Sequence, residues 1–233
     1  MSGAKVNEWD ASYLRAENFI FYPHENLVKF VNRHIRKRLG IDRFHDHIRP
    51  RNGRVLTALD FGCGIGAGVL FLHEFGIEAC GVDISPVCIE VARQYARSKG
   101  MDIADRFRVV APNERLPFQD GQFDFFVACG VLDSMPFADA RRNICELARV
   151  TSQCGYISLV AGDYRGFYGE EEVQTPHERS TVQSYFNYAK CQDLIAGTDL
   201  AIQSCELVSS EMWQVAGSRV GRYHLLLQKA GAC

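Results

Sequence analysis

Long apolar runs are absent from this sequence. No stretch of 18 or more consecutive apolar residues occurs, so a membrane-spanning helix is not expected. The first ten residues, MSGAKVNEWD, lack the apolar core of a secretory signal, and neither an internal repeat nor a low-complexity linker is present. With 233 residues, of which 47% are hydrophobic, the chain can bury one sizeable core. We therefore expect one globular, cytoplasmic protein.

The C-x-x-C motif is also missing, although the sequence contains nine cysteines. Their number is odd, and Cys63, Cys80, Cys88 and Cys129 fall in apolar runs, where a free thiol behaves as a small hydrophobic group. We expect reduced structural cysteines. The HDH stretch at residues 45–47 offers two histidines, but no second ligand pair accompanies them, so no metal site is expected.

A strong excess of charge of one sign is lacking as well. The net charge of −2 gives no global attraction to nucleic acid. The charge is uneven, however, since residues 29–54 hold nine Lys or Arg against two Asp. One interpretation of this basic segment is a solvated helix face with its loop. The other is attraction of an anionic substrate.

Short apolar runs alternate with amphipathic stretches from residue 54 onward. Strands are predicted by the runs RVLTALD, EACGVDI, FRVV, FDFFVACG and GYISLVA, and helices by GAGVLFLHEFG, SPVCIEVARQYARSKG and ADARRNICELARV. This alternation is typical of βαβ units and of a parallel sheet covered on both faces. The tail predicts a helix near residues 180–196 and the strands AIQSCELV and RYHLLLQK.

An amphipathic helix is expected over residues 23–40, before the alternating region. Leu27, Val31, Ile35 and Leu39 follow one another at i, i+4 spacing and form one apolar stripe. The stripe predicts a helix that docks on the body of the protein. We divide the chain accordingly into an N-terminal helical cap, up to residue 53, and a domain that covers the remainder.

Four glycines alternate along the stretch LDFGCGIGAG, at residues 62, 64, 66 and 68. They follow a predicted strand and precede a predicted helix. This placement leaves room for a ligand against the main chain and presents the unpaired N–H groups of a helix start. Asp83 ends the next strand, at the interval where a carboxylate accepts hydrogen bonds from ribose hydroxyls. The pattern predicts a ligand that contains a nucleoside.

The identity of this nucleoside depends on Asp60. The stretch GCGIGA fits the dinucleotide pattern G-x-G-x-x-G/A, which would suit NAD. A carboxylate at the mouth of the turn would repel a pyrophosphate, however, whereas it suits a ligand with an ammonium group and a sulfonium. Asp60 therefore favours S-adenosylmethionine.

These segments resemble the class I S-adenosylmethionine-dependent methyltransferases. LDFGCGIGAG is similar to the first motif of that family and GVDIS to its ribose-binding acidic motif, and the resemblance continues through VVAPNERLPFQDGQFDFFVACGVLDSMPF over roughly residues 54–160. It implies an α/β, Rossmann-like, doubly wound and mostly parallel seven-stranded sheet, with helices on both faces and an added N-terminal helix. S-adenosylmethionine would be the cofactor and S-adenosylhomocysteine its product.

The resemblance and the residue pattern together predict the cofactor site. Its expected residues are Asp60, Gly62, Cys63, Gly64, Gly66, Asp83, Ile84, Asn113, Glu114, Cys129, Tyr22 and Tyr13. Two places depart from the family pattern. Pro112 and Asn113 stand where the adenine loop usually has an acidic and a small residue, and Cys154 replaces the proline of a usual Pro-Gly turn.

The acceptor half is expected from the N-terminal stretch ENFIFYPHENL together with the segment GDYRGFYGEEEVQTPHERS, residues 162–180, which is long for a connection and is typical of a lid. Methyl transfer from a sulfonium is an in-line displacement, in which a hydroxyl acceptor benefits from a general base. His177 is the first candidate for this base, and Asp163 and Tyr168 are alternatives.

The acceptor class is narrowed by two further absences. No Asn/Asp-Pro-Pro-Tyr sequence follows the fourth strand, and the Pro-Cys pair of cytosine methylation is missing, so a nucleic-acid substrate is not expected. We expect a small polar acceptor, sugar-like or anionic, that is methylated on oxygen or nitrogen by a monomer or homodimer. Two alternatives stay open: an NAD-dependent oxidoreductase, and an S-adenosylmethionine-binding protein without catalysis.

Overall fold

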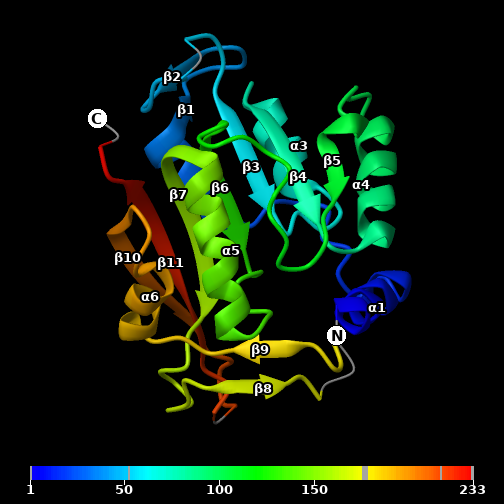
Figure 1. Cartoon of the computed structure of the whole chain (residues 1–233), viewed down its shortest axis with the longest axis vertical. Helices are drawn as coiled ribbons and strands as arrows, with labels where there is room; N and C mark the ends of the chain where they lie inside the picture. Colours follow the sequence, from blue (N-terminus) through cyan, green and yellow to red (C-terminus); the bar gives the residue numbers. More distant parts are fainter. Residues whose placement is uncertain (1, 52, 175–177, 216, 232–233) are drawn as a thin grey trace.

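A seven-stranded β-sheet forms the centre of the structure, with the strand order β10-β11-β7-β6-β3-β4-β5 (Figure 1). The computed structural model describes residues 2–51, 53–174, 178–215 and 217–231. Its five parallel strands are β3 (Thr57–Phe61), β4 (Glu78–Asp83), β5 (Phe107–Val109), β6 (Phe123–Cys129) and β7 (Thr151–Val160). Two antiparallel partners follow at one edge: β11 (Val220–Lys229) beside β7, and β10 (Leu200–Ser210) beside β11. The predicted mostly parallel sheet is confirmed.

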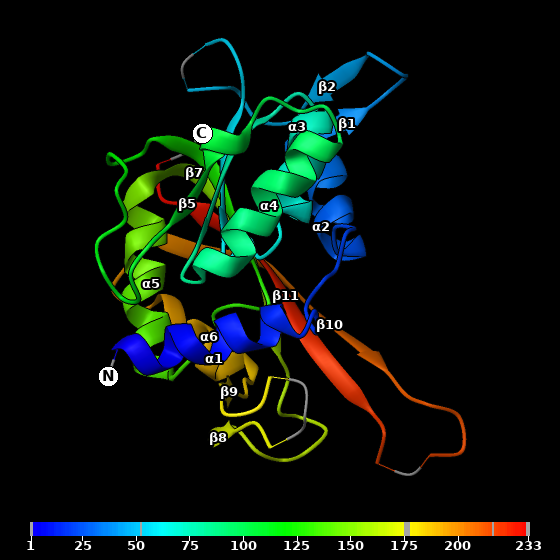
Figure 2. The same ribbon diagram turned by 90° about the vertical axis from the view of Figure 1, so that its right-hand side faces the viewer.

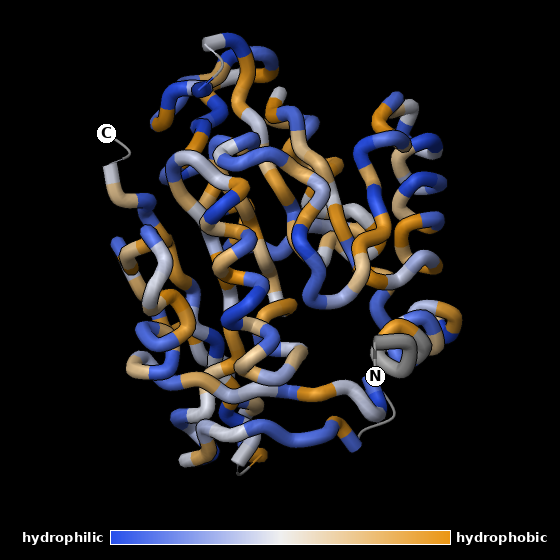
Figure 3. The backbone as a smooth tube through the Cα atoms, viewed as in Figure 1, coloured by the Kyte–Doolittle hydropathy of each residue, from blue (hydrophilic) through white to orange (hydrophobic). Residues whose placement is uncertain are grey.

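Both faces of the sheet are buried. The helices are α2 (Glu25–Phe30), α3 (Ala67–Glu74) and α4 (Pro86–Ser98), then α5 (Phe137–Val150) and α6 (Tyr188–Ile195). Ala58 packs in one apolar cluster with residues of the first three helices, whereas Leu59 packs in a second cluster with residues of the last two. Figure 2 shows α5 and α6 on one side of the sheet and α2 and α3 on the other. Figure 3 shows the hydrophobic residues that concentrate along the central strands as a result.

The start of α4 follows its sequence signal. The Ser85 hydroxyl accepts a hydrogen bond from the backbone N–H of Cys88 at 3.2 Å, and Pro86 is the first helical residue. Gly76 and Gly100, with φ of +66° and +69°, follow α3 and α4 and end them as expected. A short 3-10 turn, η2 (Ala104–Arg106), leads from α4 into β5.

The predicted helix over residues 23–40 is wrong beyond residue 35. α2 continues as a π-helical turn and then becomes a strand hairpin, with the elements η1 (Val31–Ile35), β1 (Arg36–Arg38) and β2 (Phe44–Asp46). The first three residues of the apolar stripe, Leu27, Val31 and Ile35, are buried, but the fourth, Leu39, is 46% exposed.

Arg36 accounts for this change of direction. Its Nη1 donates hydrogen bonds to the carbonyl oxygens of Phe75 and Gly76, both at 2.9 Å, and its Nε and Nη2 bond the carboxylate of Asp46. These contacts tie the chain to the end of α3 and stabilise extended backbone where the helical period of the sequence predicts another turn.

One helix, α1 (Ser2–Leu14), was not predicted. It packs against α4 and lies near the carboxyl ends of the parallel strands, as do the hairpin strands β8 (Glu170–Glu172) and β9 (Val182–Ser184) (Figure 1). In the tail, β9 occupies residues that were expected to be helical, and α6 begins only at Tyr188. Asn187 sets this start, because its side chain accepts a hydrogen bond from Lys190 N. No described helix is long and apolar enough to cross a membrane.

Candidate active site

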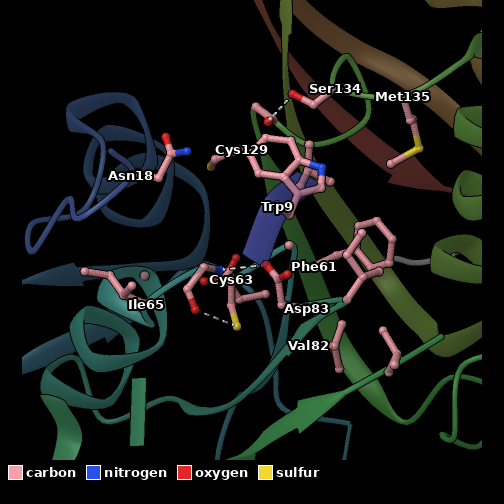
Figure 4. A pocket seen from close by; sticks show the side chains of 18 of the residues that line it. Trp9, Asn18, Phe61, Cys63, Ile65, Val82, Asp83, Cys129, Ser134 and Met135 are labelled. Atoms are coloured by element: carbon pink, nitrogen blue, oxygen red, sulfur yellow. Dashed lines mark hydrogen bonds between the residues drawn. The ribbon is translucent and has the colours of Figure 1, made fainter. Parts of the chain in front are cut away.

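A cavity of about 400 Å³ lies at the carboxyl ends of β3, β4 and β6. In doubly wound sheets ligands bind at this edge. The glycine turn after β3 forms its floor, and α1 and the segment before α2 contribute residues from the N-terminus. Figure 4 shows Trp9 of α1 within this cavity, between Asp83 on one side and Ser134 on the other.

Two glycines of the turn are required by its backbone and by close contacts. Gly62 and Gly64 have φ of +69° and +51°, which side chains rarely adopt. A Cβ on Gly62 would overlap Val131, and one on Gly64 would lie 2.9 Å from the Tyr13 hydroxyl oxygen. Both glycines line the cavity, as does Cys63 between them.

Gly66 has a role in packing. It does not line the cavity, although its φ is +87°. A Cβ at this position would lie 2.7 Å from the Phe107 ring and 3.1 Å from Ala92. Gly66 therefore permits the start of α3 to pack against β5 and α4, and its expected contact with the cofactor stays a prediction.

Asp83 connects the turn to the next helix. Its Oδ2 accepts a hydrogen bond from Gly64 N and its Oδ1 one from Ser85 N, both at 3.0 Å. Burial raises the pKa of Asp83, and these two N–H groups oppose the rise. Asp83 and its neighbour Ile84 both line the cavity. The carboxylate is therefore oriented by the backbone and still reachable by a ligand.

Asp60 is a buried carboxylate without a partner. It is 6% exposed, and a Cβ on Gly68 would overlap its Oδ2. No hydrogen bond or ion pair joins it to any described residue. Burial, and then the charge of Asp83, raise the pKa of Asp60 to about 7. A cationic group bound beside Asp60 would stabilise its ionised form, so the cavity suits a ligand with an ammonium group at this place.

α1 covers the turn from above. Tyr13 is 7% exposed and lines the cavity, and burial, together with the nearby Asp83, raises the pKa of its phenol. Trp9 lies one turn earlier, with ring centroids 6.5 Å apart. The Ser85 hydroxyl donates a hydrogen bond to Asp10, which fixes the helix to the start of α4. Tyr22 also lines the cavity but stands at its rim, 81% exposed.

The loop after β5 forms another wall. Asn113 has a φ of +60°, and its Oδ1 accepts a hydrogen bond at 3.3 Å from Nδ2 of Asn143 on α5. The neighbouring Glu114 is exposed on the rim. The structure thus places both predicted residues at the cavity, with the Asn113 oxygen already engaged and its amide N–H groups left to donate to a ligand.

The carboxyl end of β6 is held by an ion pair between the buried Asp133 and the partly exposed Arg222. Cys129 and Gly130 line the cavity there. Arg222 of β11 donates from Nη2 to Asp133 Oδ2 at 2.7 Å, and the same oxygen accepts a hydrogen bond from Val160 N at 2.8 Å. Arg222 lines the cavity too, so β11 brings a cation to the end of the strand that bears Cys129.

The long segment after β7 contributes less than the sequence suggests. Asp163 does not line the cavity, and its Oδ2 accepts a hydrogen bond from the Tyr223 hydroxyl at 2.8 Å. Tyr168 does not line it either, and is exposed beside Gly162. His177 lies outside the described residues. Of the residues of this segment that the structure describes, Glu178 reaches the cavity.

The described part of the basic segment, residues 29–51 and 53–54, lies away from the cavity and lines no part of it. Arg51 N donates to Asp124 Oδ1 at 2.7 Å, near the amino end of β6, and Figure 1 shows β1 and β2 at the end of the sheet opposite β8 and β9. The first interpretation of this segment, a solvated surface, fits its position. Among the described residues, no group of three or more His, Cys, Asp or Glu could hold a metal ion.

Several lining residues escaped the sequence analysis: Trp9, Met135, Asn143 and Arg222. Asn18, His24, Leu27 and Glu178 lie in the two segments expected to form the acceptor half, but they were not named individually as site residues. Trp9 had a usable signal, since it precedes Tyr13 by four residues and both fall on one helical face. Arg222 had none, because it stands in an ordinary strand that only the folded sheet brings to the cavity.

Comparison with known proteins points to one family. Residues 59–159 match the family described as "Methyltransferase domain". A probable chloroplastic tocopherol O-methyltransferase of Oryza sativa subsp. japonica is 33% identical over 123 residues, which cover 52% of this chain and 33% of that protein. The chain thus spans about a third of the length of this relative.

Solved structures share the fold over more of the chain. An S-adenosylmethionine-dependent methyltransferase from Methanosarcina mazei has a TM-score of 0.64 at 24% identity, covering 75% of this chain and 92% of that one. A structure described as "Conversion of a Disulfide Bond into a Thioacetal Group during Echinomycin Biosynthesis" has a TM-score of 0.67 at 18% identity, covering 96% and 92%.

Proposed function

We propose that the chain is a class I S-adenosylmethionine-dependent methyltransferase that transfers a methyl group from S-adenosylmethionine to a small-molecule acceptor, which agrees with the match of residues 59–159 to the family described as "Methyltransferase domain". The observation that carries this proposal is the pair of carboxylates at one glycine turn. Asp60 is buried without a partner among the described residues, and Asp83 is oriented by two backbone N–H groups. A ligand with both an ammonium group and a ribose satisfies both.

The lining residues suggest how the cofactor is held. Asp83 accepts hydrogen bonds from the ribose hydroxyls, and Asp60 pairs with the ammonium group of the methionine part. Gly62 and Gly64 let the cofactor lie against the main chain, and Asn113 donates to the adenine ring. When bound, S-adenosylmethionine supplies an electrophilic methyl group. The protein aligns it with the acceptor and excludes water.

We propose a cap role for the N-terminal segment, in which α1 and residues 18–24 close over a domain that begins near residue 54. Trp9, Tyr13 and Tyr22 support this role because they line the cavity from outside the sheet. The unassigned lining residues are mixed: Ile20, Leu27, Val131 and Met135 are apolar, whereas Asn18, His24, Ser134, Asp139, Asn143, Glu178 and Arg222 are polar. Such a lining suits an acceptor that has an apolar ring or chain as well as polar groups.

Two alternative functions predict results that differ from those of a methyltransferase. An NAD-dependent oxidoreductase would bind NAD, against which the buried Asp60 argues, and a protein without catalysis would bind S-adenosylmethionine but transfer nothing. The test is calorimetric titration of the purified chain with S-adenosylmethionine, S-adenosylhomocysteine and NAD. We expect 1:1 binding of the first two and none of NAD. Tight binding of NAD alone contradicts the proposal.

The Asp83→Ala variant locates the site in the same titration. Loss of charge-assisted hydrogen bonds to the ribose should weaken S-adenosylmethionine binding by about 1.5–3 kcal/mol. Asp102→Ala is the matched control, since Asp102 is exposed and outside the cavity. Equal dissociation constants for the two variants would remove Asp83 from the site.

A further inference from the structure

Arg222 is the only Lys or Arg among the described residues that line the cavity. Its Nη2 is anchored by Asp133 and by the carbonyl oxygen of Ser158, at 2.7 and 3.3 Å. The same nitrogen lies 3.2 Å from the place where Gly130 would carry a Cβ. No described residue accepts a hydrogen bond from its Nε or Nη1, so these groups are free to donate to a ligand. The guanidinium is thus a fixed cation beside the end of β6.

His24 lines the same cavity from the residue that precedes α2. Its imidazole forms no hydrogen bond with any described residue. Burial, and then the charge of Arg222, lower the pKa of His24 from its usual value near 6.5. The neighbouring His224 also has a lowered pKa, about 4, and its ring bonds Tyr156 and Asn26. Near pH 7 the His24 ring is therefore neutral and able to accept a proton.

On the basis of the proposed methyltransferase function, we propose that His24 and Arg222 activate the acceptor together. His24 is the general base that removes the proton of an acceptor hydroxyl, and Arg222 holds the oxyanion that develops. The acceptor is then an acidic hydroxyl compound, a phenol or an enol, and the product is a methyl ether.

The step balances without any further reactant. The imidazole of His24 takes the hydroxyl proton as an oxygen lone pair forms the bond to the methyl carbon. The carbon–sulfur bond breaks, and its electron pair remains on sulfur, which becomes the neutral thioether of S-adenosylhomocysteine. The imidazolium then releases its proton to water. Arg222 stabilises the negative charge on oxygen during the transfer.

The positive charge of Arg222 at this end of the cavity favours hydroxyl acceptors over amine acceptors. An aliphatic amine arrives as a cation at neutral pH, and an arylamine arrives neutral but develops positive charge on nitrogen as it takes the methyl group, so the guanidinium of Arg222 disfavours both. A hydroxyl arrives neutral and gains from the same charge as it loses its proton. The apolar side chains of Ile20, Leu27 and Met135 fit the ring or chain that carries such a hydroxyl.

The first test measures transfer of label from methyl-tritiated S-adenosylmethionine to 4-methoxyphenol and to 4-methoxyaniline, which differ in the acceptor atom. We expect label in the phenol. His24→Gln should lower kcat by roughly 10²–10⁴-fold and abolish the fall in rate toward acidic pH, while the dissociation constant of S-adenosylmethionine stays within a factor of about two. His34→Gln, on the turn that follows α2 and outside the cavity, should change neither quantity.

The second test addresses Arg222 by binding. Arg222→Gln alone would leave Asp133 buried and charged, so it is combined with Asp133→Asn. The affinity of 4-methoxyphenol for the S-adenosylhomocysteine complex should fall about tenfold or more in this double variant. An unchanged affinity of the double variant contradicts the role of Arg222, and a full-rate His24→Gln enzyme contradicts that of His24. Label in the aniline alone, or in neither compound, contradicts the assignment of a hydroxyl acceptor. If the wild type binds no S-adenosylmethionine, the proposed function itself fails.

Discussion

Asp60 is the residue at which folding and ligand binding conflict. A buried carboxyl group without a partner is unfavourable in the ligand-free protein, and its pKa of about 7 expresses this cost. Such groups gather at functional sites, because a ligand supplies the missing partner. We expect the substitution of Asp60 to affect stability and cofactor binding in opposite directions.

Asp60→Asn should therefore stabilise the ligand-free protein at pH 8. The carboxyl ionises near pH 3.8 in the unfolded chain and near 7 in the folded protein, so the wild type loses stability as the pH rises between these values. Asparagine avoids this loss, and the gain of about 1–3 kcal/mol should vanish near pH 4. Thermal unfolding at both pH values measures it. A lower melting temperature of the variant at pH 8 would show that the carboxylate already has a partner.

Gly64→Val tests the close approach of the ligand to the turn. The valine side chain would meet the Tyr13 hydroxyl and occupy the cavity in a backbone conformation with φ of +51°. S-adenosylmethionine binding should be lost in calorimetry. Gly100→Val serves as the control for backbone strain alone, because a Cβ at Gly100 meets nothing within 4 Å. Retained binding in Gly64→Val would make the turn purely structural.

The sequence predicts the site residues that lie close together along the chain. It misses those that only the folded sheet brings to the cavity. Asp60, Gly62, Gly64 and Asp83 lie within 24 residues of chain, and their spacing alone indicates a ligand that lies on the backbone. Arg222 reaches the cavity through the pairing of β11 with β7, and no spacing in the sequence encodes that contact.

Among the elements, α1 should matter most for cofactor binding. It should matter least for the folding of the sheet. It packs on α4 and covers the glycine turn, but contributes no strand to the sheet. Removal of residues 1–14 should weaken S-adenosylmethionine binding by about tenfold or more, since Trp9 and Tyr13 leave the cavity wall. The far-ultraviolet circular dichroism of the sheet should persist. Undiminished affinity would show that α1 is not part of the site.

The helices are predicted correctly where one hydrophobic period continues along the whole element. The prediction is wrong where contacts with distant parts of the chain interrupt that period. α4 and α5 follow their apolar stripes from cap to end. The helix predicted over residues 23–40 ends early because Arg36 bonds the end of α3. Similarly, α5 runs directly into β7 at Thr151, so no Pro-Gly turn is needed at Cys154. Gly155 is retained because a Cβ there would overlap the Phe126 ring.

The molecule as a whole should respond to the cofactor as one cooperative unit. A ligand that binds only the folded state at 100 times its dissociation constant stabilises it by about 2.7 kcal/mol, which for a chain of this size raises the melting temperature by roughly 5–10 °C. S-adenosylhomocysteine should produce this shift in differential scanning fluorimetry. At the same ligand concentration, Asp83→Ala should show little of it. An equal shift in the variant would place the ligand elsewhere.

The central claim is that the cavity at the ends of β3, β4 and β6 holds S-adenosylmethionine, with its ribose on Asp83 and its methionine ammonium on Asp60. A crystal structure of the protein with S-adenosylhomocysteine tests this claim most directly. The account predicts ribose oxygens within hydrogen-bonding distance of the Asp83 carboxylate and the ammonium nitrogen beside the Asp60 carboxylate. A ligand bound outside the cavity, or one whose methionine end points away from Asp60, would contradict it.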